Sequence, residues 1–134
     1  MSALSGFWVF DFNEGFPYAS ITRNGITFNK GVVLKLGSPA YVLLLVNPTT
    51  QQIALQSCDK DTPRSVPFLK EDRKRRDVLS VRWNGKDLLN TISEITNWDL
   101  GKDAYRVDGK MLPEEHAMIF NLTDAVLLGE TSNK

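Results

Sequence analysis

An internal repeat constrains the fold of this chain more than any other feature of its sequence. The pair Asn24-Gly25 matches Asn84-Gly85 at an offset of 60 residues (84 minus 24). A Leu-Gly-x-x-Ala-Tyr pattern starts at Leu36 and again at Leu100, at an offset of 64 (100 minus 36). A third pair of segments, 48–56 and 113–121, begins with proline at an offset of 65 (113 minus 48). Because chance seldom places several matches in one order, the pattern predicts two copies of one structural unit.

Each copy has the pattern of a strand, a short helix and a β-hairpin. The strand runs into an Asn-Gly pair, which tolerates the positive φ of a tight turn. Apolar residues at helical spacing predict helices over 30–36 and 87–97. Gly37 is expected to end the first helix. Apolar segments predict the hairpins 41–46 with 52–56 and 105–107, or a little beyond, with 117–122, the second across a longer, charged loop at 108–115.

The segment 41–46 is apolar on both faces of a strand, so both of its faces must be covered. One unit alone is too short to cover them, and we therefore expect the two copies to interlock into one barrel around a pseudo-two-fold axis. The expected fold class is mostly β (α+β), a single domain over 1–134. Repeat 1 covers about 19–57, a connector covers 58–77, and repeat 2 covers about 78–122.

Three segments lie outside the repeat. Residues 8–12 alternate aromatic and smaller side chains, which predicts a strand laid on the core. The connector contains Pro63 and Pro67 and is expected to be an exposed, mobile loop. The tail, 129–134, is expected to be frayed.

The bulk composition indicates a cytoplasmic protein. Basic and acidic residues number 16 each, so the net charge is zero, which argues against tight non-specific binding of nucleic acid. The only cysteine, Cys58, cannot form an internal disulfide and fits a reducing compartment. The longest apolar run has strand length and predicts no membrane span. The N-terminus has no charged start before an apolar stretch, so we expect no secretory signal.

No constellation of residues points to catalysis or to a cofactor. Glu114, Glu115 and His116 are adjacent, but no second histidine and no cysteine at ligand spacing completes a metal site. The first copy has threonines and a glutamine at the same places. The sequence also lacks a phosphate-binding glycine loop. We therefore expect neither an enzyme nor a metal or cofactor site.

The first copy resembles the AbrB/MazE/SpoVT type of swapped-hairpin barrel. The resemblance rests on the strand and helix of 26–37, followed by the hairpin segments 41–46 and 52–56; it extends faintly over 80–121. Asn29 stands where that family usually has proline. The resemblance implies a DNA-binding barrel that uses basic residues on one face. Two chains normally build that barrel, and here the duplication would supply both halves.

Basic residues supply the candidate DNA contacts. Arg23 and Arg82 occupy neighbouring places in the two copies, beside the Asn-Gly pair, where they could meet phosphates of one duplex. The alternative is ordinary solvated charge beside a turn. A dense basic cluster in the connector could grip a nucleic-acid backbone, or could only keep a strand edge from aggregating. The full candidate set is Arg23, Lys30, Lys35, Arg82, Lys86, Arg73, Lys74, Arg75 and Arg76.

The leading hypothesis is a DNA-binding, AbrB-like transcriptional regulator without catalytic activity, with double-stranded DNA as its partner. The alternative is a non-enzymatic protein-interaction module that kept the barrel and lost DNA binding, with a protein partner or a homo-oligomer. DNA binding requires Arg23, Arg82 and Lys86 on one continuous face. An interaction module requires an exposed apolar patch instead.

Overall fold

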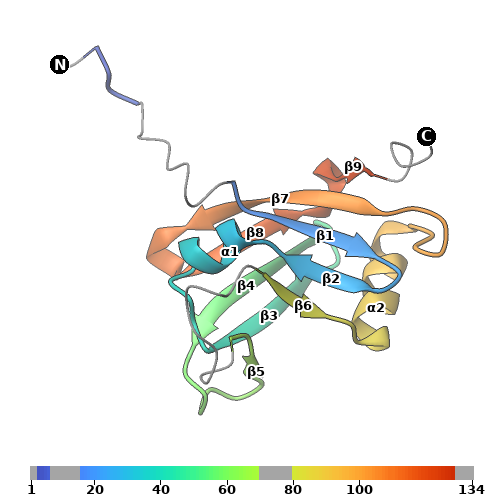
Figure 1. Cartoon of the computed structure of the whole chain (residues 1–134), viewed down its shortest axis with the longest axis horizontal. Helices are drawn as coiled ribbons and strands as arrows, with labels where there is room; N and C mark the ends of the chain where they lie inside the picture. The colour runs from blue at the N-terminus through green and yellow to red at the C-terminus, as the bar shows by residue number, and fades with distance from the viewer. Residues whose placement is uncertain (1–2, 7–15, 70–79, 129–134) are drawn as a thin grey trace.

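The computed structural model describes residues 3–6, 16–69 and 80–128. These residues form a curled antiparallel sheet of nine strands with two α-helices (Figure 1). The strands follow the order β5-β3-β4-β8-β7-β1-β2-β6, and β9 pairs with β7 off this path. The prediction of a mostly-β fold is confirmed.

The elements of the first half are β1 (Tyr18–Thr22), β2 (Gly25–Phe28), α1 (Lys30–Lys35), β3 (Tyr41–Asn47) and β4 (Gln52–Cys58). The second half holds β6 (Val81–Trp83), α2 (Lys86–Thr96), β7 (Tyr105–Leu112), the 3-10 helix η2 (Pro113–Glu115), β8 (Ala117–Asn121), the 3-10 helix η3 (Leu122–Asp124) and β9 (Val126–Leu127). The short strand β5 (Val66–Pro67) lies between the halves along the chain. Helices and hairpins therefore occur in the predicted order.

Side chains from both halves form one buried cluster. Phe28 of β2 is fully buried, and its ring lies 5.2 Å from that of Trp83 and 5.6 Å from that of Phe120. Phe68, which follows β5, contacts the same ring at 6.0 Å. Full burial of a side chain of this size stabilises a fold by about 1.5–3 kcal/mol.

The connector differs from its prediction, because part of it belongs to the core. Val66 and Pro67 of β5 pair with the start of β3, and Phe68 is only 6% exposed. The prolines of this segment predicted an exposed loop. The structure instead buries the aromatic ring of Phe68 away from water. Residues 8–12, the tail 129–134 and the basic cluster Arg73, Lys74, Arg75 and Arg76 lie outside the described residues.

The two Asn-Gly pairs have different roles, which corrects the prediction of two equal turns. Asn24 and Gly25 connect β1 to β2, and Gly25 adopts a φ of 145° beside the backbone of Trp83. Gly85 instead has a φ of −65° and is the N-cap of α2. Within the described residues, a strand equivalent to β2 is missing from the second half, where an 11-residue helix follows directly.

The predicted long loop at 108–115 is wrong, because β7 continues through most of it. The first part of β7, Tyr105 to Asp108, pairs with β1, whereas Gly109 to Leu112 pairs with β8. A Cβ at Gly109 would lie 2.5 Å from Sδ of Met118, so a larger residue at the change of partner would force the buried Met118 side chain to shift. Long-range pairing has thus converted a polar, loop-like segment into a strand.

Asn29 joins α1 to β1. Its side-chain oxygen accepts hydrogen bonds from the backbone N–H of Val32, as a helix N-cap, and from that of Tyr18, at 3.1 and 2.9 Å. Its side-chain nitrogen donates to the carbonyl of Phe16 at 2.8 Å. One amide therefore both starts the helix and ties it to the first strand.

Replacing Asn29 with alanine should lower the free energy of unfolding by about 1–3 kcal/mol, because it removes a helix cap and leaves backbone donors without partners. Asn29→Asp keeps both accepted hydrogen bonds and loses only the donated one, so its loss should be smaller. Urea denaturation of the two variants and the wild type measures the difference. Equal losses for alanine and aspartate would contradict this role of the side-chain oxygen.

Candidate functional site

Two of the predicted basic residues lie together at the end of the β1–β2 hairpin. Arg23 is in the hairpin turn and Lys86 is the first residue of α2. Both line a hollow of about 510 Å³ that also contains Asn90, Trp98 and Asp99. The hollow therefore carries charges of both signs.

A polar row crosses the outer surface of four neighbouring strands. The strand register places Arg106 of β7 opposite Ser20 of β1, Ser20 opposite Thr27 of β2, and Thr27 opposite Arg82 of β6. The strand residues that alternate with them point to the opposite face of the sheet and are buried in the core: Ala19, Ile21, Ile26, Phe28, Val81 and Val107. We call Arg106, Ser20, Thr27 and Arg82 the arginine row.

Neighbouring side chains orient Arg106. Its guanidinium carbon lies 4.0 Å above the ring centroid of Tyr18, in a cation–π contact. Its Nε lies 3.4 Å from Oδ1 of Asp108, in an ion pair whose side chains are 41% and 77% exposed. Such an exposed pair contributes little to stability, but it partly offsets the positive charge at this end of the row.

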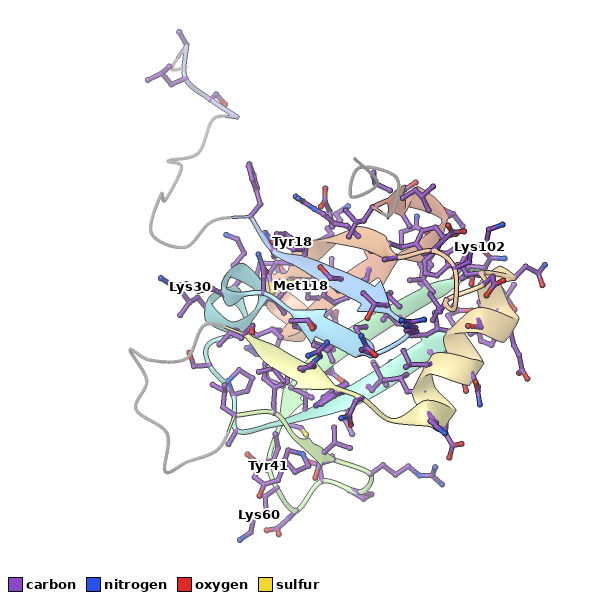
Figure 2. All side chains as sticks on the ribbon, turned by 45° about the vertical axis from the view of Figure 1, so that its right-hand side comes forward. Tyr18, Lys30, Tyr41, Lys60, Lys102 and Met118 are labelled. Atoms are coloured by element: carbon purple, nitrogen blue, oxygen red, sulfur yellow. The ribbon has the colours of Figure 1, made fainter. Side chains whose placement is uncertain are left out.

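Among the described residues, the predicted basic residues Lys30 and Lys35 do not join this surface. Lys30 begins α1, just beyond the end of β2 that is opposite to the Arg23 turn (Figure 2). Lys35 is the last residue of α1. The structure thus brings Arg23, Arg82 and Lys86 to one region of the molecule, and it places Lys30 and Lys35 elsewhere.

Sequence reasoning missed Arg106. Arg106 lies between the apolar residues Tyr105 and Val107 at the start of a strand. Because successive side chains of a strand point to opposite faces, this alternation indicated that Arg106 faces outward. Which strand lies beside it depends on the β1–β7 pairing, which joins residues far apart in the chain. Local pattern could therefore not place it in a row with Arg82.

Carboxylates near the hollow shape its electrostatics. The Tyr105 ring stacks on Trp98, with ring centroids 3.8 Å apart and planes 10° from parallel. Burial, and to a smaller extent the negative charges of Asp103 and Asp99, raise the pKa of Tyr105 above its ordinary value of 10.0. Negative charge beside Arg23 and Lys86 weakens their attraction for phosphate.

The remaining candidates for chemistry lie apart. Within the described residues, no group of at least three His, Cys, Asp or Glu side chains could hold a metal ion. His116 follows η2 in a left-handed conformation, and its carbonyl accepts a hydrogen bond from the N–H of Ser57. Cys58, at the end of β4, is half-buried. None of the helices in the described segments is long and apolar enough to cross a bilayer.

An apolar hollow separates the two ends of the curled sheet. It has a volume of about 520 Å³ and is lined by Leu44 of β3, Val66 and Pro67 of β5, Arg82 and Trp83 of β6, and Leu88 of α2. The leucines, Val66 and Trp83 pack against the core but are only half-buried. We call this hollow the seam.

Comparison with known proteins does not identify a family. Neither a scan against protein-family models nor searches of curated proteins and of solved structures finds a match to the chain. The geometry of the surfaces is therefore the guide to function.

Tyr105 stacks on Trp98, which lines the hollow, so the ionisation of Tyr105 reports on the carboxylates nearby. Because its pKa is raised in the folded protein, the neutral phenol is favoured there, and this contribution to stability is lost as the pH rises through the folded pKa. A difference titration at the phenolate absorbance between wild type and Tyr105→Phe should give a midpoint above 10.0. Asp103→Asn should lower that midpoint toward the ordinary value. A Tyr105 midpoint at or below the ordinary value would contradict the electrostatic description.

Proposed function

We propose that this protein binds double-stranded DNA without catalysing a reaction, as a regulator of the AbrB-like type, through the outer surface of β7, β1, β2 and β6. The observation that carries the proposal is the arginine row. It offers two guanidinium groups with hydroxyl groups between them, and guanidinium and hydroxyl groups are common phosphate ligands. The row lies on paired strands, so its contacts would set the register of the protein on the duplex.

The dimensions of the row suit a duplex. Three inter-strand steps separate Arg106 from Arg82, which corresponds to about 14 Å at about 4.8 Å per step. The major groove of B-DNA is about 12 Å wide. The two arginines could therefore reach phosphates on both sides of one groove, with Arg23 and Lys86 at the margin.

The central strand pairing supports the duplicated AbrB-like barrel. In the β4–β8 pair, Ala54 lies opposite Ile119, and these residues are equivalent at the repeat offset of 65 (119 minus 54). The flanking pairs, Gln52 with Asn121 and Gln56 with Ala117, exchange under the same offset (117 minus 52 and 121 minus 56). A two-fold axis between β4 and β8 would generate this pattern, as expected for two copies of one unit.

Substitution of the arginine row tests DNA binding. Arg82→Ala and Arg106→Ala should each weaken binding to a selected duplex more than binding to a scrambled one, because ordered contacts set register. Each lost phosphate contact should lower the slope of log affinity against log salt by about 0.9. Fluorescence anisotropy at several salt concentrations measures both effects.

Lys60→Ala is the matched control, since Lys60 is exposed in the loop after β4 and belongs neither to the arginine row nor to the lining of the hollow at Arg23 and Lys86. It should leave affinity and salt slope unchanged. Absence of binding by the wild type at low salt, or equal losses for Lys60→Ala and Arg82→Ala, would refute the proposal.

A second candidate function, a protein-interaction module, is favoured by the seam. β1 pairs with β7, but the equivalent pairing of β6 with β3 is replaced by β5 at Tyr41 and Val42. Pro67 of β5 has no N–H to extend the sheet. The half-buried apolar lining between two strand ends would suit an extended apolar peptide.

Amide chemical shifts test this second candidate. Addition of peptides with alternating valine and threonine should shift the signals of Arg82, Trp83 and Leu88 if the seam binds an extended segment. Leu88→Lys should abolish those shifts, because it places a charge in the apolar hollow. Leu34→Lys, an equal change at an exposed position of α1, should not. Unchanged seam signals at millimolar peptide would exclude this function.

A further inference from the structure

On its outer side, β7 carries a carboxylate between two cations. Val107 is buried in the core, so its neighbours Arg106 and Asp108 point to the opposite, outer side of the strand. By the same alternation Lys110, which is exposed, lies on that outer side too. Along the strand the outward charges are therefore Arg106, Asp108 and Lys110, in that order.

Neighbouring groups orient the carboxylate of Asp108. Asp108 lies opposite Tyr18 in the β1–β7 pair, and the guanidinium carbon of Arg106 lies 4.0 Å above the centroid of the Tyr18 ring. The Nε atom of Arg106 donates a hydrogen bond to Oδ1 of Asp108, with 3.4 Å between the two atoms. The Asp108 side chain is 77% exposed, so its negative charge still faces solvent.

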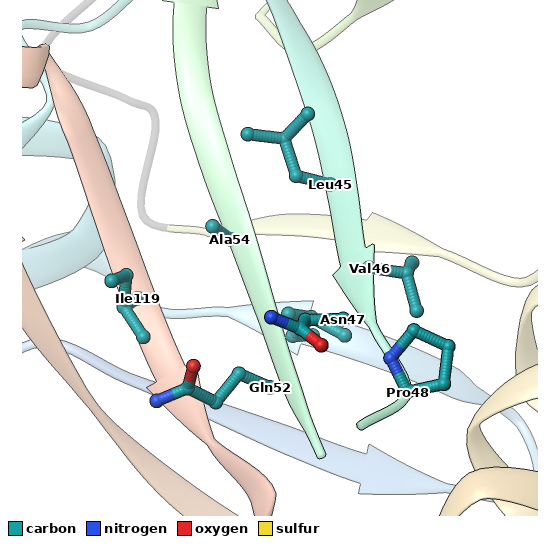
Figure 3. Close-up of a pocket in the computed structure, with 8 residues that line it drawn as sticks. Leu45, Val46, Asn47, Pro48, Gln52, Ala54 and Ile119 are labelled. Atoms are coloured by element: carbon teal, nitrogen blue, oxygen red, sulfur yellow. The ribbon is translucent and has the colours of Figure 1, made fainter. Parts of the chain in front are cut away.

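β7 also forms the margin of the surface proposed for DNA. Across the strands, Lys110 lies opposite Ile119, which is followed by Ala54 and then by Leu45. Figure 3 shows Ile119, Ala54 and Leu45 next to one another on neighbouring strands, beside a hollow of about 360 Å³. These apolar side chains offer no hydrogen-bond donor to a phosphate. A duplex on the arginine row would therefore have one of its sugar-phosphate backbones close to β7.

We propose that Asp108 is a specificity-determining residue of the DNA site, an inference that rests on the proposed function. Asp108 lies two residues from Arg106, about 7 Å along β7. A DNA backbone that runs along β7 would bring a second phosphate to Asp108, where like charges repel. A backbone that crosses β7 at Arg106 would avoid that contact. The site therefore accepts duplexes in registers that keep phosphates away from Asp108, and it disfavours the others.

Discrimination between duplexes explains a carboxylate at this place better than stability does. An exposed ion pair contributes little to the free energy of folding. A binding surface gains specificity from unfavourable contacts with the wrong partner as well as from favourable contacts with the right one. Because the net charge of the chain is zero, long-range attraction for DNA is small, and single charged residues can decide which register is bound.

Removal or reversal of this charge should increase the affinity for the wrong DNA. Asp108→Asn should strengthen binding to a scrambled duplex about two- to fivefold, the effect of one exposed charge contact. It should change binding to a duplex that the wild type selects from a random pool by less, so the ratio of the two affinities should fall. Asp108→Lys should strengthen binding to the scrambled duplex further and should steepen its log–log salt dependence by about 0.9, because it adds a phosphate contact.

Fluorescence anisotropy with the selected and the scrambled duplex, at several salt concentrations, measures these affinities. Asp61→Asn makes the same change at an exposed position in the loop after β4 and should alter neither affinity. Circular dichroism checks the fold of each variant.

The outcomes separate this inference from the proposed function. An affinity ratio that neither Asp108→Asn nor Asp108→Lys changes, or equal effects of Asp61→Asn and Asp108→Asn, would overturn the role of Asp108 while DNA binding stands. If neither the wild type nor Asp108→Lys binds any duplex at low salt, the proposed function fails and the role of Asp108 fails with it.

Discussion

The pairing of β4 with β8 is the contact on which the rest of this structure depends. A two-stranded hairpin is at best marginally stable in water, and β4–β8 pairing joins two of them into one four-stranded surface. In this register Ile53, Leu55, Met118 and Phe120 all face the core and are at most 1% exposed. A slip of one residue would turn this apolar set toward solvent. The register is therefore specified by burial.

The long strand β7 connects this four-stranded surface to the rest of the sheet. It leaves β8 at Gly109 and pairs with β1, so strands of opposite halves become neighbours. Its outward residues consequently belong to two different surfaces. Arg106 extends the arginine row, and Lys110 lies opposite Ile119 of β8. One strand thus links the surface proposed for DNA with the central β4–β8 pair.

The positions of the charged residues matter more for binding here than the net charge of the chain. The net charge is zero, and long-range attraction for a polyanion is correspondingly small. Tyr18 orients Arg106, and Asp108 partly offsets the charge of Arg106. Asp99 lines the same hollow as Arg23. Such a surface favours a few positioned contacts over bulk electrostatic binding.

Local sequence determined the kinds of elements and their order, because helical spacing, Asn-Gly pairs and Gly37 act within a few residues. It predicted α1, α2 and both hairpins. Only the tertiary structure decided that β5 and Phe68 join the core, that β7 extends through Leu112, and that Lys30 lies away from Arg23. It also placed Arg106 beside Ser20 and Arg82. These outcomes depend on pairing between distant strands, whose partners and register are selected by burial of the whole core.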